Sequence, residues 1–183
     1  MSFFSKAATT ALTGLAVLGF ASSAFAHHVE QQSWDKGQME QLTQAALDVG
    51  ISLHRDIGIC NEKKGLMGAM YEKGHLLVCT EAHKDEDGVI DGDELADTVR
   101  HELLHAVQYC LGREMIHPQH QEQFIVDAQN HLHMPMMGYD PEDWGGEAEA
   151  RVLSFLLSEE EIAPMLRQAC ANHVWPKDIE AEV

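Results

Sequence analysis

One segment constrains the fold of this chain more than any other, because it carries every local signal of a packed helix. It opens with a capping-box pattern, Asp91 and Glu94, and Gly112 follows its expected end. Its apolar residues recur at helical spacing on one face: Leu95, Val99, Leu103, Ala106 and Cys110. No proline or glycine interrupts the pattern. We therefore predict a long helix that buries one face against a core.

The opposite face of this helix carries the motif His101-Glu102-Leu103-Leu104-His105, which is HExxH. Residues four apart on a helix lie one above the other, so the two imidazoles can bind one metal ion. Glu102 is turned about 100° from His101, and its carboxylate can accept a proton from a metal-bound water. The alternative is a helix with two surface histidines.

A catalytic zinc ion usually has three protein ligands and keeps one position for water, so a third ligand should come from elsewhere. The chain is rich in histidine, the commonest protein metal ligand, with 12 among its 183 residues. The metzincin motif continues with a glycine three residues after the second histidine and a histidine three residues later. Gln108 and Leu111 occupy those positions here, which excludes that class.

A later segment, Trp144-Gly145-Gly146-Glu147-Ala148-Glu149-Ala150-Arg151, is expected to open another helix. With the HExxH motif it resembles the gluzincin-type zinc metallopeptidases, which pair HExxH with a later helix bearing a Glu, often as Glu-x-x-Ala. The resemblance covers about half of the chain. It implies that Zn²⁺ is bound by His101, His105 and Glu147.

Two carboxylates compete for the role of third ligand. Glu147 fits the Glu-x-x-Ala pattern, with Ala150 three residues later. Glu149 is the fallback, but it lies on the apolar side of the helix, where a buried carboxylate needs a partner. One position departs from the resemblance. These families often carry Asp or Asn four residues after the ligand, to orient a metal-bound histidine, and this chain has Arg151.

The rest of the chain predicts an α+β fold. A helix is expected over 35–49, a strand over 51–59, and a hairpin from 66–71 and 75–80. Further helices are expected over 119–130, from Asp140-Pro141 towards 147–158, and around Pro164, which starts or kinks the last one. We expect a small antiparallel sheet of about three strands, packed against the HExxH helix and the C-terminal helices, in a gluzincin-like arrangement.

The acidic stretch 83–94 nearly matches an EF-hand calcium loop. Oxygen ligands would come from Asp85, Asp87, Asp91 and Glu94, with Gly88 at the required sixth position. His83 stands where the pattern needs Asp, and the preceding segment is a predicted strand, so the usual helix pair is missing. The alternative, which we prefer, is an acidic loop that caps the HExxH helix.

The first 26 residues are typical of a signal peptide, with Lys6 followed by an apolar stretch and Ala24-Phe25-Ala26 at the cleavage site. A membrane anchor is the alternative, although the 16 residues from Ala11 to Ala26 are short for a span that needs about 20. Cleavage after Ala26 would leave a single domain, 27–183, that is secreted or periplasmic.

Export changes the interpretation of the four cysteines, since an even number outside a reducing cytosol favours disulfides. Four cysteines allow three connectivities, of which we prefer the pairing of sequence neighbours, Cys60–Cys79 and Cys110–Cys170. A cysteine zinc site is the alternative, but the chain has no CxxC pair.

Further residues near the motif have weaker interpretations. One histidine among His117, His120, His131 and His133 could polarise a substrate carbonyl, although loop or capping roles are preferred. Tyr109, Tyr139 and Trp144 are candidates for the cleft wall or for packing. A short run of methionines is better explained as core filling: Met134, Met136 and Met137.

Composition narrows the partners of this chain. Hydrophobic residues make up 45% of it, which indicates a globular protein, and its net charge of −18 disfavours nucleic acid and anionic membrane surfaces as partners.

We predict an exported zinc-dependent peptidase acting on peptides or proteins, with Glu102 as general base. The main alternative is a secreted protein that binds zinc or calcium without turnover. A peptide deformylase is disfavoured, because its EGCLS-like motif is absent.

Overall fold

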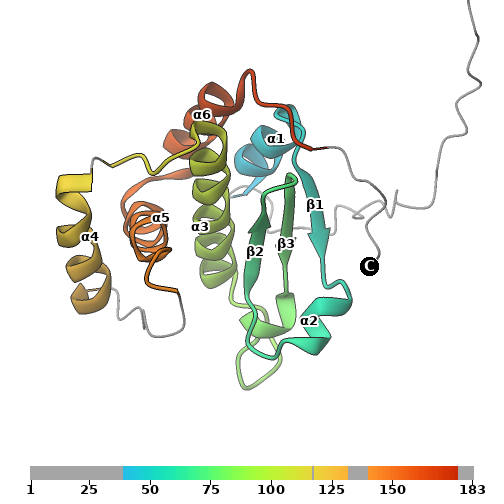
Figure 1. The fold of residues 1–183 in the computed structure, drawn as a ribbon. Coiled ribbons are helices and arrows are strands. Elements are labelled where there is room, and N and C mark those ends of the chain that lie inside the picture. The colour runs from blue at the N-terminus through green and yellow to red at the C-terminus, as the bar shows by residue number, and fades with distance from the viewer. Residues whose placement is uncertain (1–38, 117, 132–139, 177–183) are drawn as a thin grey trace, which may run out of the picture.

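The computed structural model describes residues 39–116, 118–131 and 140–176 (Figure 1). The predicted signal peptide and its cleavage site lie outside these residues. The helices are α1 (Glu40–Asp48), α2 (Gly58–Glu62), α3 (Gly92–Leu111), α4 (Pro118–His131), α5 (Trp144–Leu156) and α6 (Glu159–Cys170). The strands are β1 (Ser52–Arg55), β2 (Gly68–Tyr71) and β3 (His75–Val78), and a 3-10 helix, η1, spans Thr80–His83. The fold is therefore α+β, as predicted.

The sheet has three strands, but it is mixed and not antiparallel. Its order is β1-β3-β2, with β2 antiparallel to β3 in the predicted hairpin and β1 parallel to β3. The prediction of an antiparallel sheet was wrong because α2 carries the chain from β1 to the far edge. The hairpin then returns β3 beside β1 in the same direction.

The strand predicted over 51–59 ends early, at Arg55. Asp56 adopts a left-handed backbone conformation, with φ of 52°, and its carboxylate accepts hydrogen bonds from the Thr80 N–H at 2.6 Å and the Thr80 hydroxyl at 2.7 Å. These bonds turn the chain towards the end of β3. Ile57 and Ile59, which continued the alternating pattern, therefore lie at the start of α2 and within it.

Helix α3 lies at the centre of the fold, between the sheet and helices α5 and α6 (Figure 1). Asp91 caps its N-terminus as predicted, because its carboxylate accepts from the N–H groups of Asp93 and Glu94 at 3.0 and 3.1 Å. The return bond of a capping box is not formed, because the Asp91 N–H donates to the His83 carbonyl at 2.7 Å. Gly112 ends it in the left-handed conformation, with φ of 65°. Leu103, Leu104 and Val107 are fully buried, so more than one face of α3 packs against the core.

The remaining helices differ from the predictions in their starts. α4 lies where it was expected. α1 begins at Glu40, within the predicted range 35–49, and residues 35–38 at the predicted start lie outside the described part of the chain. α5 begins at Trp144 and not at Asp140-Pro141, because 141–143 forms a turn in which Asp140 Oδ1 accepts from the Glu142 N–H. α6 begins at Glu159, where the Glu161 carboxylate accepts from the Ser158 N–H and hydroxyl, so Pro164 lies inside it and does not start it.

Two disulfides join distant elements, with the predicted pairing. Cys60–Cys79 ties α2 to the end of β3, and Cys110–Cys170 ties the C-terminal end of α3 to that of α6. Both fit an oxidising compartment.

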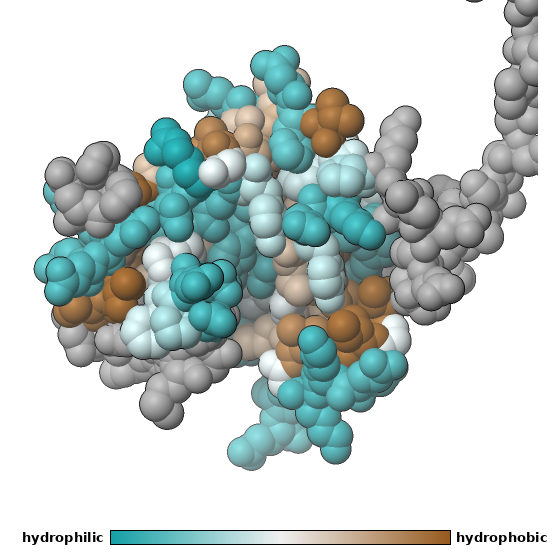
Figure 2. Space-filling model, in the orientation of Figure 1, coloured by the Kyte–Doolittle hydropathy of each residue, from teal (hydrophilic) through white to brown (hydrophobic). Residues whose placement is uncertain are grey.

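In the part of the chain that the structure describes, no helix combines the length and apolarity needed to cross a membrane. Hydrophilic residues cover most of the face in Figure 2, and its apolar patches are small and separate.

Candidate metal centre

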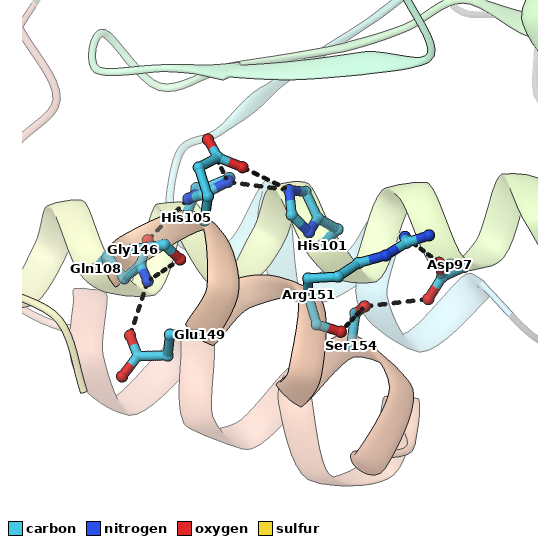
Figure 3. A network of polar contacts seen from close by, with 9 residues as sticks. Asp97, His101, His105, Gln108, Gly146, Glu149, Arg151 and Ser154 are labelled. Atoms are coloured by element: carbon cyan, nitrogen blue, oxygen red, sulfur yellow. Dashed lines mark hydrogen bonds and ion pairs between the residues drawn. The ribbon is translucent and has the colours of Figure 1, made fainter. Parts of the chain in front are cut away.

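Three side chains converge where α5 crosses α3. His101 and His105 project from successive turns of α3, with their Nε2 atoms 3.1 Å apart (Figure 3). Glu147, in the first turn of α5, places one carboxylate oxygen 3.4 Å from His101 Nε2 and the other 3.4 Å from His105 Nε2. No other group of three or more His, Cys, Asp or Glu side chains among the described residues is as suitable for holding a metal ion.

The spacing of these atoms suits a small tetrahedral cation. Nitrogen and oxygen ligands lie about 2.0–2.2 Å from Zn²⁺, so two of them at the tetrahedral angle are roughly 3.3–3.5 Å apart. The two Nε2 atoms lie 3.1 Å apart, and each lies 3.4 Å from a different oxygen of the Glu147 carboxylate, so each neighbouring pair is close to that value. One ligand atom from each of the three residues lies within 4.8 Å of the other two. Glu147 Oε2 is also buried without a hydrogen-bond partner among the described residues, as expected for an oxygen that faces a cation. The donor set therefore fits zinc.

The interactions among the three side chains, and not their burial, set the pKa values of Glu147 and His105 in the metal-free triad. Burial alone would raise the pKa of Glu147, but its polar interactions with the His101 and His105 imidazoles, whose Nε2 atoms lie 3.4 Å from its oxygens, outweigh it and lower this pKa to about 2. Burial alone would lower the pKa of His105, but the hydrogen bond and charge of Glu147, with smaller contributions from Glu102 and Gln108, raise it to about 9. Without metal, His105 is therefore protonated at neutral pH, and a metal ion must displace that proton.

Glu102 lies on the side of α3 that faces β2. It is only 8% exposed, and burial raises its pKa, although the charges of His101 and His105 act in the opposite direction. The backbone of Met70, in β2, also donates a hydrogen bond to its carboxylate. β2 can come this close because Gly68 has no side chain. A Cβ there would lie 3.1 Å from Glu102 Cγ.

Glu149 does not join the triad. It is 1% exposed and accepts hydrogen bonds from the Met115 N–H at 2.9 Å, the Ile116 N–H and the Gln108 side chain. The partners that a buried Glu149 was expected to need are thus Gln108 on α3 and two backbone N–H groups shortly before α4. In the sequence analysis Gln108 served only to exclude metzincins, and its contact with His105 was missed. The available signal was its spacing, because residues three apart on a helix are neighbours on its surface.

Arg151 takes no part in orienting a histidine. Its guanidinium forms an ion pair with Asp97 on α3 at 2.5 Å, and Asp97 also accepts from the Ser154 hydroxyl at 3.1 Å (Figure 3). His101 Nδ1 is buried and has no hydrogen-bond partner among the described residues. The surroundings of His101 therefore differ from the arrangement that the gluzincin resemblance implies.

A cleft of about 490 Å³ opens beside the triad. It is lined by the C-terminal half of α3, the residues that follow it and the start of α5: His105, Gln108, Tyr109, Gly112, Arg113, Glu114, Glu142, Asp143, Gly146 and Glu147. Tyr109 thus lies in the cleft wall, one of the two roles considered for it. Burial, and then the surrounding carboxylates, raise the pKa of Tyr109.

The acidic loop forms a tight turn at the start of α3. Asp85 Oδ1 accepts from the N–H groups of Asp87 and Val89, both at 2.9 Å, and the Asp91 carboxylate caps the helix. Glu94 Oε2 lies 3.5 Å from the buried His83 Nδ1. These contacts match the acidic-cap interpretation. The four proposed oxygen ligands do not form a cluster suited to a metal ion, and calcium binding stays a prediction.

The other candidates are dispersed or undescribed. Trp144 packs with Ala148, Val152, Phe124 and Ile125 in a small apolar cluster between α4 and α5. His120 is exposed on α4, and His131 ends that helix. Several residues lie outside the described ranges: His117, His133, Met134, Met136, Met137 and Tyr139.

The fold and this donor set define a small α+β protein with a candidate mononuclear metal centre between two crossing helices. The chain belongs to the family described as "Domain of unknown function (DUF8637)", whose model matches residues 33–171. That range contains all three triad residues and Glu102. No curated protein and no solved structure matches the chain.

Proposed function

We propose that this protein is an exported zinc-dependent peptidase. The observation that carries the proposal is the convergence of His101, His105 and Glu147 at metal-ligand spacing, with the Glu102 carboxylate buried next to them. A zinc ion bound there supplies a Lewis acid that polarises a carbonyl and makes a water acidic enough to react near neutral pH.

Glu102 has the surroundings expected of a general base. Its raised pKa makes the carboxylate a better proton acceptor, and the Met70 N–H keeps it oriented towards the sheet side of the site. In peptide hydrolysis it accepts a proton from the attacking water and passes a proton to the leaving amine. His101, His105 and Glu147 would hold the ion.

The sheet and the cleft favour a peptide as substrate. β2 is an edge strand that pairs only with β3 among the described strands, so its outer backbone edge can accept an extended peptide beside Glu102. The cleft carries the carboxylates of Glu114, Glu142 and Asp143 against one guanidinium, that of Arg113. We expect peptides with Lys or Arg near the cleaved bond to be preferred.

The first test is metal content. Mature wild-type protein should hold about one zinc ion per chain, and His101→Ala, His105→Ala and Glu147→Gln should each lower zinc retention. Glu160→Gln, which removes an exposed charge from α6, is the matched control and should retain zinc. Full zinc retention in the His101→Ala/His105→Ala double variant would refute the metal centre.

The second test separates chemistry from metal binding. Glu102→Gln keeps the shape of the side chain but removes the base, so hydrolysis of a peptide library should fall by about 10²–10⁴-fold while zinc content stays normal. Undiminished hydrolysis in this variant would refute the role of Glu102.

One observation favours the second candidate function, metal binding without turnover. His101 Nδ1 lacks a hydrogen-bond partner among the described residues, and Arg151 pairs with Asp97 instead. Metal-binding histidines usually donate this second nitrogen to an acceptor. A wild-type protein that holds zinc but cleaves nothing in the library would establish this alternative.

A further inference from the structure

The Gln108 side chain bridges α3 and α5 directly behind the triad. Its Oε1 lies 2.8 Å from His105 Nδ1, and its Nε2 donates to the Gly146 carbonyl at 3.0 Å and to Glu149 Oε2 at 2.7 Å (Figure 3). The amide oxygen and both amide N–H groups of Gln108 therefore have hydrogen-bond partners. Glu149 is in turn fixed by the N–H groups of Met115 and Ile116.

These contacts determine which way round the amide lies. Gly146 O and the Glu149 carboxylate can only accept hydrogen bonds, so the amide NH₂ must face them. The amide oxygen must then face His105, and an oxygen that can only accept requires a proton on His105 Nδ1. The other ring nitrogen, Nε2, is the atom that points at Glu147 and His101.

We propose that Gln108 is a positioning residue of the metal centre, which holds the His105 ring with Nδ1–H outward so that Nε2 is presented to the metal. The inference rests on the proposed function only in that a metal binds at the triad. It adds a residue three positions after the motif and a carboxylate, Glu149, that acts through Gln108.

The two histidines are supported unequally. His105 is held from behind by a chain of hydrogen bonds that ends in backbone N–H groups, whereas His101 Nδ1 has no hydrogen-bond partner among the described residues. The loss of Gln108 would therefore remove the hydrogen bond that holds the His105 ring at its Nδ1 atom. Partners of this kind contribute about 10–100-fold to metal affinity in other proteins.

The test is the zinc dissociation constant of Gln108→Met, measured by competition with a chromophoric chelator. Methionine keeps the length of the side chain and removes the hydrogen bonds, so we expect zinc to bind about 10–100-fold more weakly than to wild type. Gln44→Ala, which removes an exposed Gln44–Asp48 hydrogen bond on α1, is the control and should bind as wild type does. Co²⁺ absorption spectra should show an altered ligand geometry in Gln108→Met only.

An exchange of the two groups distinguishes positioning from general packing. Gln108→Glu alone places two carboxylates together and should weaken zinc binding strongly. In Gln108→Glu/Glu149→Gln the acceptor facing His105 and a donor between positions 108 and 149 are both restored. The exchange leaves the Gly146 carbonyl without its donor and turns an amide NH₂ towards the Met115 N–H, so zinc affinity should recover in part, to clearly above that of Gln108→Glu.

The outcomes separate the two proposals. If wild type binds no zinc, the metal centre itself is refuted. If wild type binds zinc and Gln108→Met binds it equally well, the role of Gln108 is refuted and the metal centre stands. If Gln108→Met does not fold, the exchange decides: a folded double variant that binds zinc no better than Gln108→Glu overturns the inference.

Discussion

Substituting Gly68 by alanine would place a methyl group in the contact between β2 and α3. The new Cβ would lie 2.7 Å from Thr98 Cγ2 and 3.1 Å from Glu102 Cγ. Unstrained carbon atoms approach to about 3.5–4.0 Å, so the overlap with the threonine methyl is close to 1 Å. The third neighbour, the Leu77 carbonyl oxygen of β3, would lie 3.2 Å away. β2 or α3 must therefore shift, because the two closest neighbours lie on α3, the central helix.

The expected cost is about 1–3 kcal/mol of unfolding free energy, as for other overpacked contacts. Thr98→Ser removes the methyl group that overlaps most. The double variant Gly68→Ala/Thr98→Ser should therefore regain most of the stability. The contact with Glu102 remains in the double variant, so its hydrolysis should stay low while zinc content is unchanged.

Urea unfolding curves of wild type, both single variants and the double variant measure the stabilities, and a peptide assay measures hydrolysis. Thr98→Ser alone is the matched control. The packing argument fails if Gly68→Ala unfolds at the same urea concentration as wild type, or if Thr98→Ser gives no recovery. The placement of Glu102 fails if the double variant hydrolyses peptides as fast as the Thr98→Ser control.

Three further predictions concern the disulfide at the end of α3, the pH dependence of zinc binding, and the cap at the start of α3. Substituting both Cys110 and Cys170 by alanine opens a crosslink across 60 residues of sequence and should lower the unfolding free energy by roughly 4 kcal/mol in urea curves; an unchanged midpoint would contradict it. Because the metal-free pKa of His105 is raised to about 9, zinc binding should release a proton, and apparent zinc affinity from chelator competition should fall by about tenfold per pH unit from pH 8 to pH 7; a flat profile would refute this. Asp91→Ala removes the helix cap and should cost about 1 kcal/mol, equally with and without calcium, whereas a loss that appears only with calcium would instead support a calcium site.

The sequence predicted best where several local signals agreed. The capping residue Asp91, the apolar stripe and Gly112 all indicated one helix, and that helix has the predicted ends. The hairpin around Gly74 was predicted for the same reason. These features depend on contacts between near neighbours in the chain, and such contacts can be inferred from spacing alone.

Prediction failed where distant residues decide the local structure. The alternating pattern continued past Asp56, but bonds from Thr80, 24 residues later, end the strand there. The parallel pairing of β1 with β3 depends on the path of the chain through α2, which no periodicity records. Gln108 was overlooked in the same way, because its partners, Gly146 and Glu149, are about 40 residues away.

The position of Glu147 relative to the histidines is set by polar contacts on both sides of it. On one side Arg151 pairs with Asp97, one helical turn before His101. On the other side Glu149 and Gly146 bind Gln108, three residues after His105. The ion pair is partly exposed and contributes at most about 1 kcal/mol, so its main effect is on the register of α5 along α3. An Asp or Asn at position 151, the residue that the gluzincin resemblance calls for, would remove this ion pair. The chain thus fixes the site by joining the two helices on either side of it, and among the described residues a side chain supports Nδ1 of His105 but not Nδ1 of His101.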